Sequence, residues 1–364
     1  MVKYKIAVVP GDCVGPEVTA EGVKILKATA EKYRFEVSLA EYMAGGAAID
    51  AYGDPLPEET IDGCRSSDAI LFGSVGGPKW DDLPWENVHG AITPSRGIQR
   101  LRQIFQLFAN IRPAYLFPEL VDNTPLRPEV VAGTDLIVVR EQCGGLYFGE
   151  PRGIIGMGEE RKGINTLSYT VPEVRRVAHV AFKLARQRRK KVTSVDKHNV
   201  MESSILWRQV VKEVAKEYPD VELNHLYADA CAMKIIENPR QFDVILAGNI
   251  FGDILSDLSS VLAGSIGMMP SASIGDGTFG LYEPIHGSAP DIAGKGIANP
   301  VGSIMSVAMM LDYSFGRKEA AESIKSAVKS VLSRGYRTAD LYKPGTKKVS
   351  TSEFGDLVAA GILK

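Results

Sequence analysis

Short apolar runs alternate along the chain with longer segments in which apolar residues recur at helical spacing. The runs predict strands over residues 6–9, 35–40, 69–73, 135–140, 192–195, 221–227 and 243–247, and the periodic segments predict helices over 17–32, 172–189, 201–217, 229–237 and 252–263. From Pro300 the pattern is helical again to beyond Val331. This alternation is typical of a doubly wound α/β protein with a parallel or mixed sheet.

The segment of residues 144–170 breaks this alternation. It is rich in glycine and charge and has neither helical period nor core-strand character, so we expect a protruding β-arm there. The 364 residues correspond to roughly two domains of about 150 residues, and no Pro- and Ser-rich linker divides them. Any two domains are therefore expected to be interwoven rather than joined in series.

Composition and charge are those of an ordinary globular protein, with 45% hydrophobic and 24% charged residues. A net charge of -2 provides no overall field for nucleic acid or an anionic membrane, so an anionic ligand must be recognised locally. The four cysteines form no CxxC pair, and no apolar stretch is long enough for a signal peptide or a membrane span. These features predict a soluble cytoplasmic protein with reduced thiols.

Two local patterns resemble ligand-binding motifs, one for a dinucleotide and one for nucleic acid, but their surroundings favour structural roles. A GxGxxG pattern at residues 275–280 is followed by LYEPIHGSAP, in which Pro284 and Pro290 exclude the helix of a dinucleotide-binding fold. We interpret it as a glycine-rich loop. The basic run of residues 186–191 closes a predicted helix, where cations interact favourably with the helix dipole and face water.

Three aspartates form the strongest candidate site. Asp253 and Asp257 lie four residues apart in GNIFGDILSDLSS, so both project from one helix face, about 5–6 Å apart at Cβ. Neighbours such as Ile254 and Leu255 predict a largely buried helix, in which two carboxylates need a cation or the helix N-terminus as a partner. Asp229 lies where a predicted strand meets a helix. Three carboxylates without a soft ligand suit Mg²⁺ or Mn²⁺.

Cationic residues indicate a second part of the same site. Arg102 and Arg112 frame LRQIFQLFANIR, Arg140 ends the apolar strand DLIVVR, and Lys197 ends TSVDK. Ligands bind at strand ends in open α/β sheets, and arginine binds carboxylates through paired hydrogen bonds. Each arginine alone is more typical of a salt bridge, but together with a hard-cation site they predict a pocket for a small polycarboxylate.

Seven motifs along almost the whole chain resemble the β-decarboxylating dehydrogenases, which act on isopropylmalate, isocitrate, homoisocitrate or tartrate. The motifs are VVPGDCVGPEV, GSVGGPKWD, ANIRPA, VVREQCGGLYFGEPRG, SVDKHNV, GNIFGDILSDLSS and EPIHGSAPDIAGKGIANP. The last two are long and specific. The match is strongest with the members that act on 3-isopropylmalate.

The resemblance implies an isopropylmalate/isocitrate dehydrogenase-like fold with a non-Rossmann cofactor site. Its two interwoven domains would be residues 1–107 plus 264–364, for the cofactor, and 108–263, for dimerisation, metal and substrate. It also implies a homodimer with shared active sites, in which Lys197 and Asp229 reach the site of the second subunit.

The reaction that the resemblance implies is oxidative decarboxylation of 3-isopropylmalate to 4-methyl-2-oxopentanoate and CO2, with reduction of NAD, in leucine biosynthesis. Homoisocitrate, methylmalate and tartrate are alternative substrates. A silent regulatory subunit is a further alternative, but such a chain would be expected to lose the acid, base or metal ligands, and all are present here.

Matching motifs assign a role to each site residue. Tyr147 and Lys197 would be the acid and the base. The substrate would be bound by Ile98, Arg102, Arg112, Arg140 and Asp229, and Mg²⁺ or Mn²⁺ by Asp229, Asp253 and Asp257. The NAD site would comprise Val14, Glu283, His286, Gly287, Ser288, Ala289, Asp291 and Asn299, with Asp291 disfavouring the 2′-phosphate of NADP.

Two positions depart from the family pattern. The fingerprint GDGIGPE reads GDCVGPE here, so Cys13 replaces a glycine near the cofactor pocket. Counting back from Arg102, Ser95 stands where isopropylmalate enzymes usually carry glutamate, in the segment that contacts the substituent at substrate C3. An alkyl substituent is favoured by Ile98, with Val14 and Val200 as possible walls, and a polar or carboxylate substituent by Arg96, Gln99 and Arg100.

Overall fold

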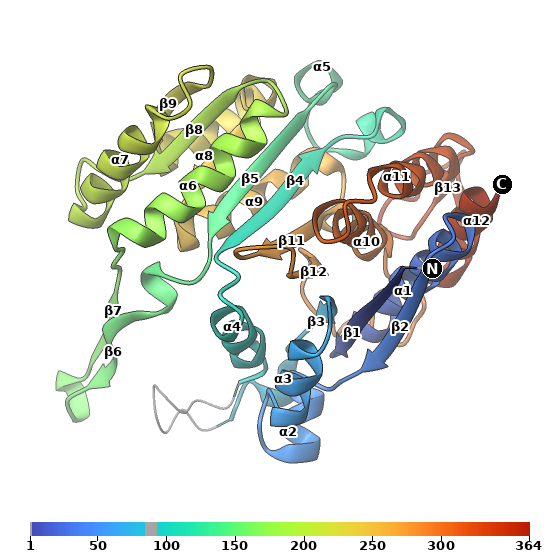
Figure 1. Cartoon of the computed structure of the whole chain (residues 1–364), viewed down its shortest axis with the longest axis horizontal. Helices are drawn as coiled ribbons and strands as arrows, with labels where there is room; N and C mark the ends of the chain where they lie inside the picture. Colours follow the sequence, from blue (N-terminus) through green and yellow to red (C-terminus); the bar gives the residue numbers. More distant parts are fainter. Residues whose placement is uncertain (1, 84–92) are drawn as a thin grey trace.

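A mixed sheet of ten strands runs through the computed structural model, which describes residues 2–83 and 93–364 (Figure 1). Its order is β2-β1-β3-β12-β11-β4-β5-β10-β8-β9. The strands are β1 (Lys3–Gly11), β2 (Glu36–Glu41), β3 (Ala69–Ser74), β4 (Ala109–Tyr115), β5 (Asp135–Glu141), β8 (Lys191–Asp196), β9 (Glu222–Tyr227), β10 (Val244–Ala247), β11 (Pro270–Ile274) and β12 (Gly280–Pro284). The strands in the two outer parts of the sheet pair in parallel. In the centre, β11 is antiparallel to β12 and β4, and β4 is antiparallel to β5.

Helices pack on this sheet along its whole width (Figure 1). They are α1 (Gly15–Lys32), α2 (Gly46–Tyr52), α3 (Glu58–Arg65), α4 (Pro94–Ile104), α5 (Pro128–Val131), α6 (Val171–Arg186), α7 (Glu202–Ala215), α8 (Ala228–Glu237), α9 (Asn249–Ala263), α10 (Val301–Tyr313), α11 (Lys318–Ser333) and α12 (Thr351–Leu363). α6 packs on β5, β8 and β10, α9 on β4 and β5, and α10 on β11 and β12. None of the helices within the described residues is both long and apolar enough to span a membrane.

The α/β architecture predicted from the sequence is confirmed, with a mixed sheet. The apolar pattern does not reveal β4, β11 and β12, because these central strands carry buried polar residues. Asn110 and Arg112 lie in β4, Ser271 and Ser273 in β11, and Glu283 in β12. The strands that the hydrophobic pattern misses are thus the ones that bring polar groups to the middle of the sheet.

Two segments with many glycines form antiparallel hairpins. The GxGxxG residues connect β11 to β12, with Gly277 at a φ of 88°, so the prediction of a glycine-rich loop is confirmed. In the segment predicted as an arm, β6 (Gly149–Ile155) pairs with β7 (Lys162–Thr166) and extends away from the main sheet (Figure 1). Apolar side chains near its tip are exposed, including Ile154 at 70% and Met157 at 86%.

The prediction that the basic run faces water at a helix end is wrong for Arg188, which is only partly exposed, whereas Arg186, Arg189 and Lys190 are exposed. α6 already ends at Arg186, and Arg188 pairs with Asp135 and with the buried Asp243, at 2.8 Å in both cases. Asp243 also accepts a hydrogen bond from the backbone N–H of Arg189 at 2.9 Å. The basic run therefore connects the segment between α6 and β8 to the neighbouring strands through ion pairs and hydrogen bonds.

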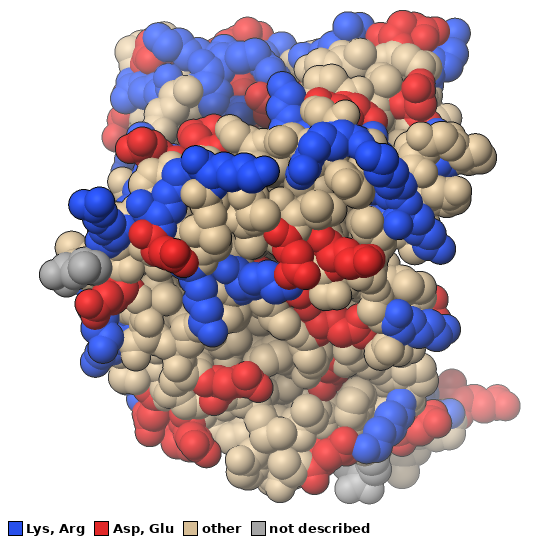
Figure 2. Space-filling view, turned by 90° about the vertical axis from the view of Figure 1, so that its right-hand side faces the viewer, with Lys and Arg blue, Asp and Glu red and all other residues tan. Residues whose placement is uncertain are grey.

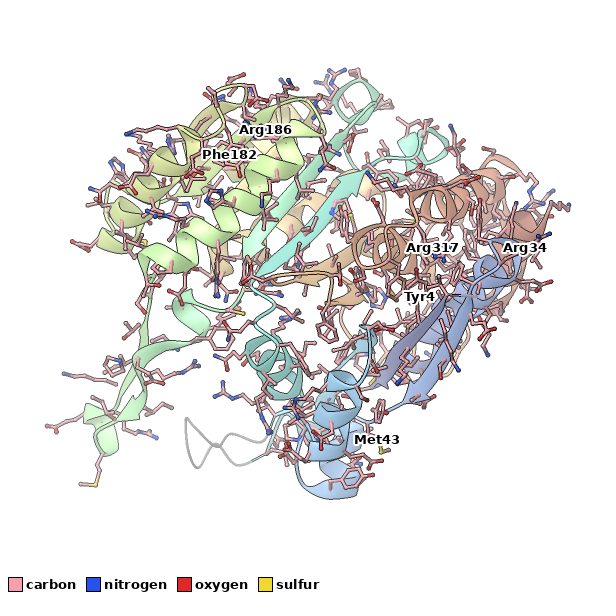
Figure 3. The ribbon with its side chains drawn as sticks, viewed as in Figure 1. Tyr4, Arg34, Met43, Phe182, Arg186 and Arg317 are labelled. Carbon is pink, nitrogen blue, oxygen red and sulfur yellow. The ribbon has the colours of Figure 1, made fainter. Side chains whose placement is uncertain are left out.

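Contacts between arginine and aromatic side chains also connect segments at the edge of the sheet. Near the N-terminus Tyr4 stacks on Phe315 at 3.9 Å between ring centroids, and Arg317 lies 4.5 Å from the ring of Phe35 and donates to the Tyr4 hydroxyl (Figure 3). On the surface of this half of the molecule, positive and negative side chains are interspersed (Figure 2).

α9 approaches β5 closely at Gly252, opposite Arg140. A Cβ built on Gly252 would lie 2.7 Å from the Cβ and 3.1 Å from the Cα of Arg140. The expectation of a largely buried helix is wrong at Ile254, which is 59% exposed. The buried face consists instead of Asn249, Gly252, Leu255, Ser256, Ser259, Leu262 and Ala263. Small residues on this face let the helix carry polar groups close to the sheet.

We expect Gly252→Ala to lower the free energy of unfolding by about 1–3 kcal/mol, because the added methyl group must push α9 away from β5. Equilibrium denaturation by urea measures this loss. Gly163→Ala in β7 is the control, since its Cβ would meet nothing within 4 Å. Equal stability of the two variants would show that the approach at Gly252 does not constrain the helix.

Candidate active site

Two arginines from neighbouring antiparallel strands lie in the interior of the protein. Arg112 on β4 and Arg140 on β5 are only 6% and 3% exposed. Asn110 Oδ1 accepts from Arg112 Nε at 2.5 Å, and Asn249 Oδ1 accepts from Arg140 Nε at 3.0 Å and Nη2 at 2.7 Å. These amides fix the planes of both guanidinium groups and leave the Nη1 atoms directed at α9.

The aspartates of α9 meet these arginines. Asp253 accepts hydrogen bonds from Arg140 Nη1 and, at 3.1 Å, from Arg112 Nη1, and Asp257 accepts from the same Arg112 nitrogen at 3.1 Å. The predicted pair on one helix face is therefore present, and in this chain a guanidinium lies between the two carboxylates. Ser256 Oγ completes the contacts of Arg112 Nη1 at 2.8 Å.

Charge and burial compete at this cluster. Burial by itself would raise the pKa of Asp253, but Arg140 and Arg112 outweigh it, so that the pKa of this carboxyl lies below its usual value. For Asp257, which lies one helical turn further along α9, burial raises the pKa although the charge of Arg112 opposes this shift. Burial, followed by the charge of Arg112, lowers the pKa of Arg140. The arrangement thus keeps Asp253 ionised between Arg112 and Arg140.

Tyr147 follows β5 in the short turn Gly145–Tyr147 and reaches the same carboxylate. Its hydroxyl donates to Asp253 Oδ2 at 3.1 Å, and the guanidinium of Arg140 lies 5.6 Å from its ring centroid. Burial and the negative charge of Asp253 raise the pKa of Tyr147. The hydroxyl therefore stays protonated at neutral pH and can act as a proton donor.

Arg102 connects this cluster to the predicted cofactor loop. It lies on α4, and its Nη2 is 2.6 Å from Glu283 Oε1 at the end of β12. Its Nε is buried and has no hydrogen-bond partner in the described part of the chain. Its charge contributes to lowering the pKa of both Arg140 and Asp253. The three predicted substrate arginines therefore share one electrostatic environment.

Lys197 and Asp229 form a separate pair. Lys197 Nζ lies 2.7 Å from Asp229 Oδ2, where the end of β8 meets the start of α8, and this contact is the main cause of the lowered pKa of Asp229. Within residues 2–83 and 93–364 no ion pair joins them to Asp253 or Asp257, and no three His, Cys, Asp or Glu side chains gather at one point. One chain thus holds two parts of the predicted site, each with acidic and basic groups.

Residues of the predicted cofactor loop line a cavity of about 360 Å³. Its lining includes Val14, His286, Ala289 and Asn299, together with mostly apolar neighbours. His286 Nδ1 lies 2.8 Å from the carbonyl of Gly287, while its Nε2 is buried without a partner among the residues described. Burial lowers the pKa of His286, so the ring is neutral and can hydrogen-bond a ligand.

Other residues of the predicted cofactor loop do not line this cavity. The carbonyl of Ser288 accepts from the backbone N–H of Val14 at 3.0 Å, whereas Gly287 and Asp291 are exposed. Cys13 has a φ of 56°, in the left-handed region that favours glycine, and its Sγ lies 3.5 Å from the carbonyl of Gly76. The replacement of glycine by Cys13 therefore affects the backbone as well as the side-chain volume.

The residues expected near the substrate substituent lie in different environments. Ile98 is 7% exposed and packs in a core cluster with Leu101 and Leu107, whereas Ser95 is exposed. Val200 is 66% exposed, and Val14 lies in the cofactor-loop cavity.

Residues 5–358 match the sequence profile of the family described as isocitrate/isopropylmalate dehydrogenase. The chain is 54% identical over 358 residues to 3-isopropylmalate dehydrogenase of Aquifex aeolicus, covering 98% of this chain and 97% of that protein. It is 53% identical to the enzyme of the same name from Geobacter sulfurreducens, covering 99% of each. The chain belongs to the isocitrate/isopropylmalate dehydrogenase family.

Solved structures of the family share this fold. Isocitrate dehydrogenase from Methylococcus capsulatus superimposes with a TM-score of 0.86 at 35% identity, covering 99% of this chain and 100% of that one. A β-decarboxylating dehydrogenase from Thermococcus kodakarensis superimposes with a TM-score of 0.77 at 36% identity, covering 99% and 96%. The family and the fold predicted from the sequence motifs are therefore confirmed.

The sequence motifs do not reveal the two amides that orient the buried arginines. Asn110 and Asn249 lie in the motifs ANIRPA and GNIFGD. A motif does not indicate that these two side chains contact buried arginines. Asp340, which accepts from Asn299 Nδ2 at 3.0 Å beside the cofactor-loop cavity, lies outside the motifs. The sequence feature that could have indicated these amides is the position of an asparagine at the end of a strand or the start of a helix.

We expect Asn249→Ala to lower the free energy of unfolding by about 1–3 kcal/mol, because two buried nitrogens of Arg140 lose their acceptor. The same side chain also donates to the carbonyl of Gly144 at 2.8 Å, so the turn before Tyr147 should loosen. Urea denaturation and hydrogen exchange of residues 144–147 measure both effects. Asn224→Ala is the matched control on the exposed flank, and an equal effect there would contradict the assignment.

Proposed function

We propose that this chain is an NAD-dependent dehydrogenase that oxidatively decarboxylates 3-isopropylmalate to 4-methyl-2-oxopentanoate and CO2, a step of leucine biosynthesis. The observation that carries the proposal is the cluster of Arg112, Arg140, Asp253 and Tyr147 in a chain that is 54% identical to 3-isopropylmalate dehydrogenase of Aquifex aeolicus. A malate has two carboxylates and a hydroxyl, and the cluster supplies cations for the former and acid–base groups for the latter.

The arginines would bind the substrate. Arg112 and Arg140 are buried and fixed by amides, so little conformational entropy is lost when they bind a carboxylate. Under the proposed domain division, Arg102 would lie in the domain of residues 1–107 plus 264–364, and the other two arginines in the domain of residues 108–263. A substrate bound by all three would draw the two domains together and exclude water from the reacting atoms.

The acidic residues fit a hard divalent cation. Asp253 and Asp257 offer oxygen ligands from successive turns of α9, and the lowered pKa of Asp253 keeps that ligand charged. We propose that they hold Mg²⁺ or Mn²⁺ together with Asp229 of a second copy of the chain. When bound, such a cation would polarise the C2 oxygen of the substrate and stabilise the negative charge that develops as CO2 leaves.

The cavity at the cofactor loop fits the adenosine part of NAD. Its apolar lining suits a purine ring, and the neutral His286 has a buried nitrogen that needs a partner. Asp291 is exposed on the same loop, where its carboxylate would accept from a ribose hydroxyl and repel the 2′-phosphate of NADP. Glu283 and Arg102 would connect this loop to the substrate.

Two proton transfers accompany the bond changes. Lys197 of the second subunit would accept the C2 hydroxyl proton as hydride leaves C2 for NAD, which oxidises the alcohol to a ketone. The bond from C3 to its carboxylate then breaks, CO2 leaves, and the electron pair of that bond forms the enolate of the product ketone. Tyr147, which the raised pKa keeps protonated, would return a proton to C3.

We further propose that the protein is a homodimer. Exposed apolar side chains lie on the arm at Ile154, Ile155 and Met157, on α8 at Met233 and on α9 at Ile254. Such residues are normally buried in an interface when they occur together. A second copy that covered these side chains would add its Lys197 and Asp229 to a site that already holds Asp253 and Tyr147.

A spectrophotometric assay tests the proposed reaction. We expect NADH to form with 3-isopropylmalate, NAD and Mg²⁺, with kcat/KM for NADP lower because of Asp291. Tyr147→Phe should lower kcat roughly 10²- to 10⁴-fold, the usual contribution of a general acid. Absence of turnover by the wild-type enzyme with NAD would overturn the proposal.

Subunit mixing tests the shared site. We expect Asp253→Asn and Lys197→Met to be nearly inactive as separate homodimers. Refolding the two together should restore activity, because one site of each mixed dimer then contains Asp253 from one chain and Lys197 from the other. If each chain contained a whole site, no mixed dimer would have an intact site and activity would stay at the level of the single variants.

A further inference from the structure

The turn that carries Tyr147 begins directly after β5 and is held by a buried carboxylate. Glu141, the last residue of β5, is fully buried, and its two oxygens accept hydrogen bonds from two consecutive backbone N–H groups. Oε1 accepts from Cys143 and Oε2 accepts from Gly144, at 2.9 Å in both cases. Because both oxygens are used, this carboxylate fixes the direction in which the chain leaves the sheet.

The same turn is held by α9 and leads directly to the proposed acid. The carbonyl of Gly144 accepts a hydrogen bond from Asn249 Nδ2 at 2.8 Å, and Gly145, at a φ of 72°, lets the chain bend there. Two residues later the hydroxyl of Tyr147 donates to Asp253 Oδ2 at 3.1 Å. A displacement at Gly144 would therefore be transmitted to Tyr147 through only two intervening residues.

Two charged side chains of α6, which packs beside β5, lie near the carboxylate of Glu141 (Figure 1). Arg176 Nη2 is 3.9 Å from Glu141 Oε1, and the Nε of this arginine is buried with no hydrogen-bond partner within residues 2–83 and 93–364. Glu173 lies on the Gly144 side, since a Cβ built on Gly144 would be 3.1 Å from Glu173 Oε1 and 3.3 Å from Glu141 Oε2. One charge of each sign thus acts on Glu141.

Burial and these charges determine when Glu141 is ionised. Burial raises the pKa of Glu141 to about 7, although the two backbone N–H groups oppose this shift. The charge of Glu173 also raises this pKa, and the charge of Arg176 lowers it. Burial raises the pKa values of Cys143 and Tyr169, two further titratable groups beside Glu141, so that both are neutral near pH 7. Glu141 therefore changes its charge close to neutral pH, and a protonated oxygen is a poorer acceptor.

We infer that Glu141 is a positioning residue for Tyr147, and that it holds the turn in place for proton transfer only while its carboxyl group is ionised. This inference rests on the proposed function, in which Tyr147 returns a proton to C3. When Glu141 is protonated, one backbone N–H of the turn loses its strong acceptor and the turn can move. Because a misplacement of about 1 Å can cost roughly a hundred-fold in rate, this movement slows the proton transfer.

A double-mutant cycle with Tyr147 tests the positioning role. At a pH above the pKa of Glu141, we expect Glu141→Gln to lower kcat for 3-isopropylmalate roughly ten- to a hundred-fold and to change KM less than about three-fold. In a Tyr147→Phe enzyme, which has no acid to position, the same substitution should lower kcat less than about three-fold. An equal fall of kcat in both backgrounds, or a KM that rises as much as kcat falls, would overturn the inference.

Substitutions on α6 test the ionisation without altering the turn itself. In the wild-type enzyme kcat should fall as the pH is lowered through about 7. Arg176→Gln should move this fall to higher pH, because a cation that favours the ionised carboxyl is lost, and Glu173→Gln should move it to lower pH, each by about 0.3–1 unit. Glutamine can still cap α6 at this position. Arg175→Gln is the matched control, since Arg175 pairs with Glu213 at 2.9 Å and its loss should leave the pH profile unchanged.

The pH shifts must act through Glu141. In a Glu141→Gln enzyme, which has nothing to titrate at this position, we expect Arg176→Gln and Glu173→Gln to leave the pH profile unmoved. If Glu141→Gln does not fold, opposite shifts of the two α6 variants beside an unmoved Arg175→Gln remain the test. Shifts that persist without Glu141, that have the same sign or that are absent would overturn the inference and leave the proposed function intact. Absence of turnover by the wild-type enzyme would overturn both.

Discussion

Two buried guanidinium groups set the main constraint on this structure. Arg112 and Arg140 are held in the interior, where an unpaired charge would be very unfavourable, so strong acceptors must surround them. Asn110, Asn249 and the aspartates of α9 supply these acceptors. The position of α9 against the sheet is therefore required by the charge of the site as well as by apolar packing.

Local features of the sequence make this arrangement possible. Gly252 lets α9 approach β5 until a Cβ would clash with Arg140, and antiparallel pairing of β4 with β5 brings Arg140 beside Asn110. The central strands carry polar residues at positions that a purely structural core would fill with apolar ones. Under the proposed function, the strands that build the core would also bind the substrate, which would link substrate recognition to stability.

Arginines outside the central cluster also connect different elements of the fold. Arg102 joins α4 to the cofactor loop through Glu283, and Arg152 joins the arm to the turn of Tyr147. Arginines on α4 and β6 therefore connect the cofactor loop and the arm to the central cluster.

The sequence by itself determined the α/β alternation, the glycine-rich loop and the family, because apolar periodicity and long motifs depend only on local order along the chain. It also selected the arginines and acids that the fold gathers at Arg112, Arg140 and Asp253. Only the tertiary structure decided that an arginine lies between Asp253 and Asp257, that Ile254 faces outward, that Arg188 binds Asp243 and that Ile98 belongs to the core. These outcomes depend on contacts between residues far apart in the chain, and no local pattern encodes which distant partner satisfies a buried charge.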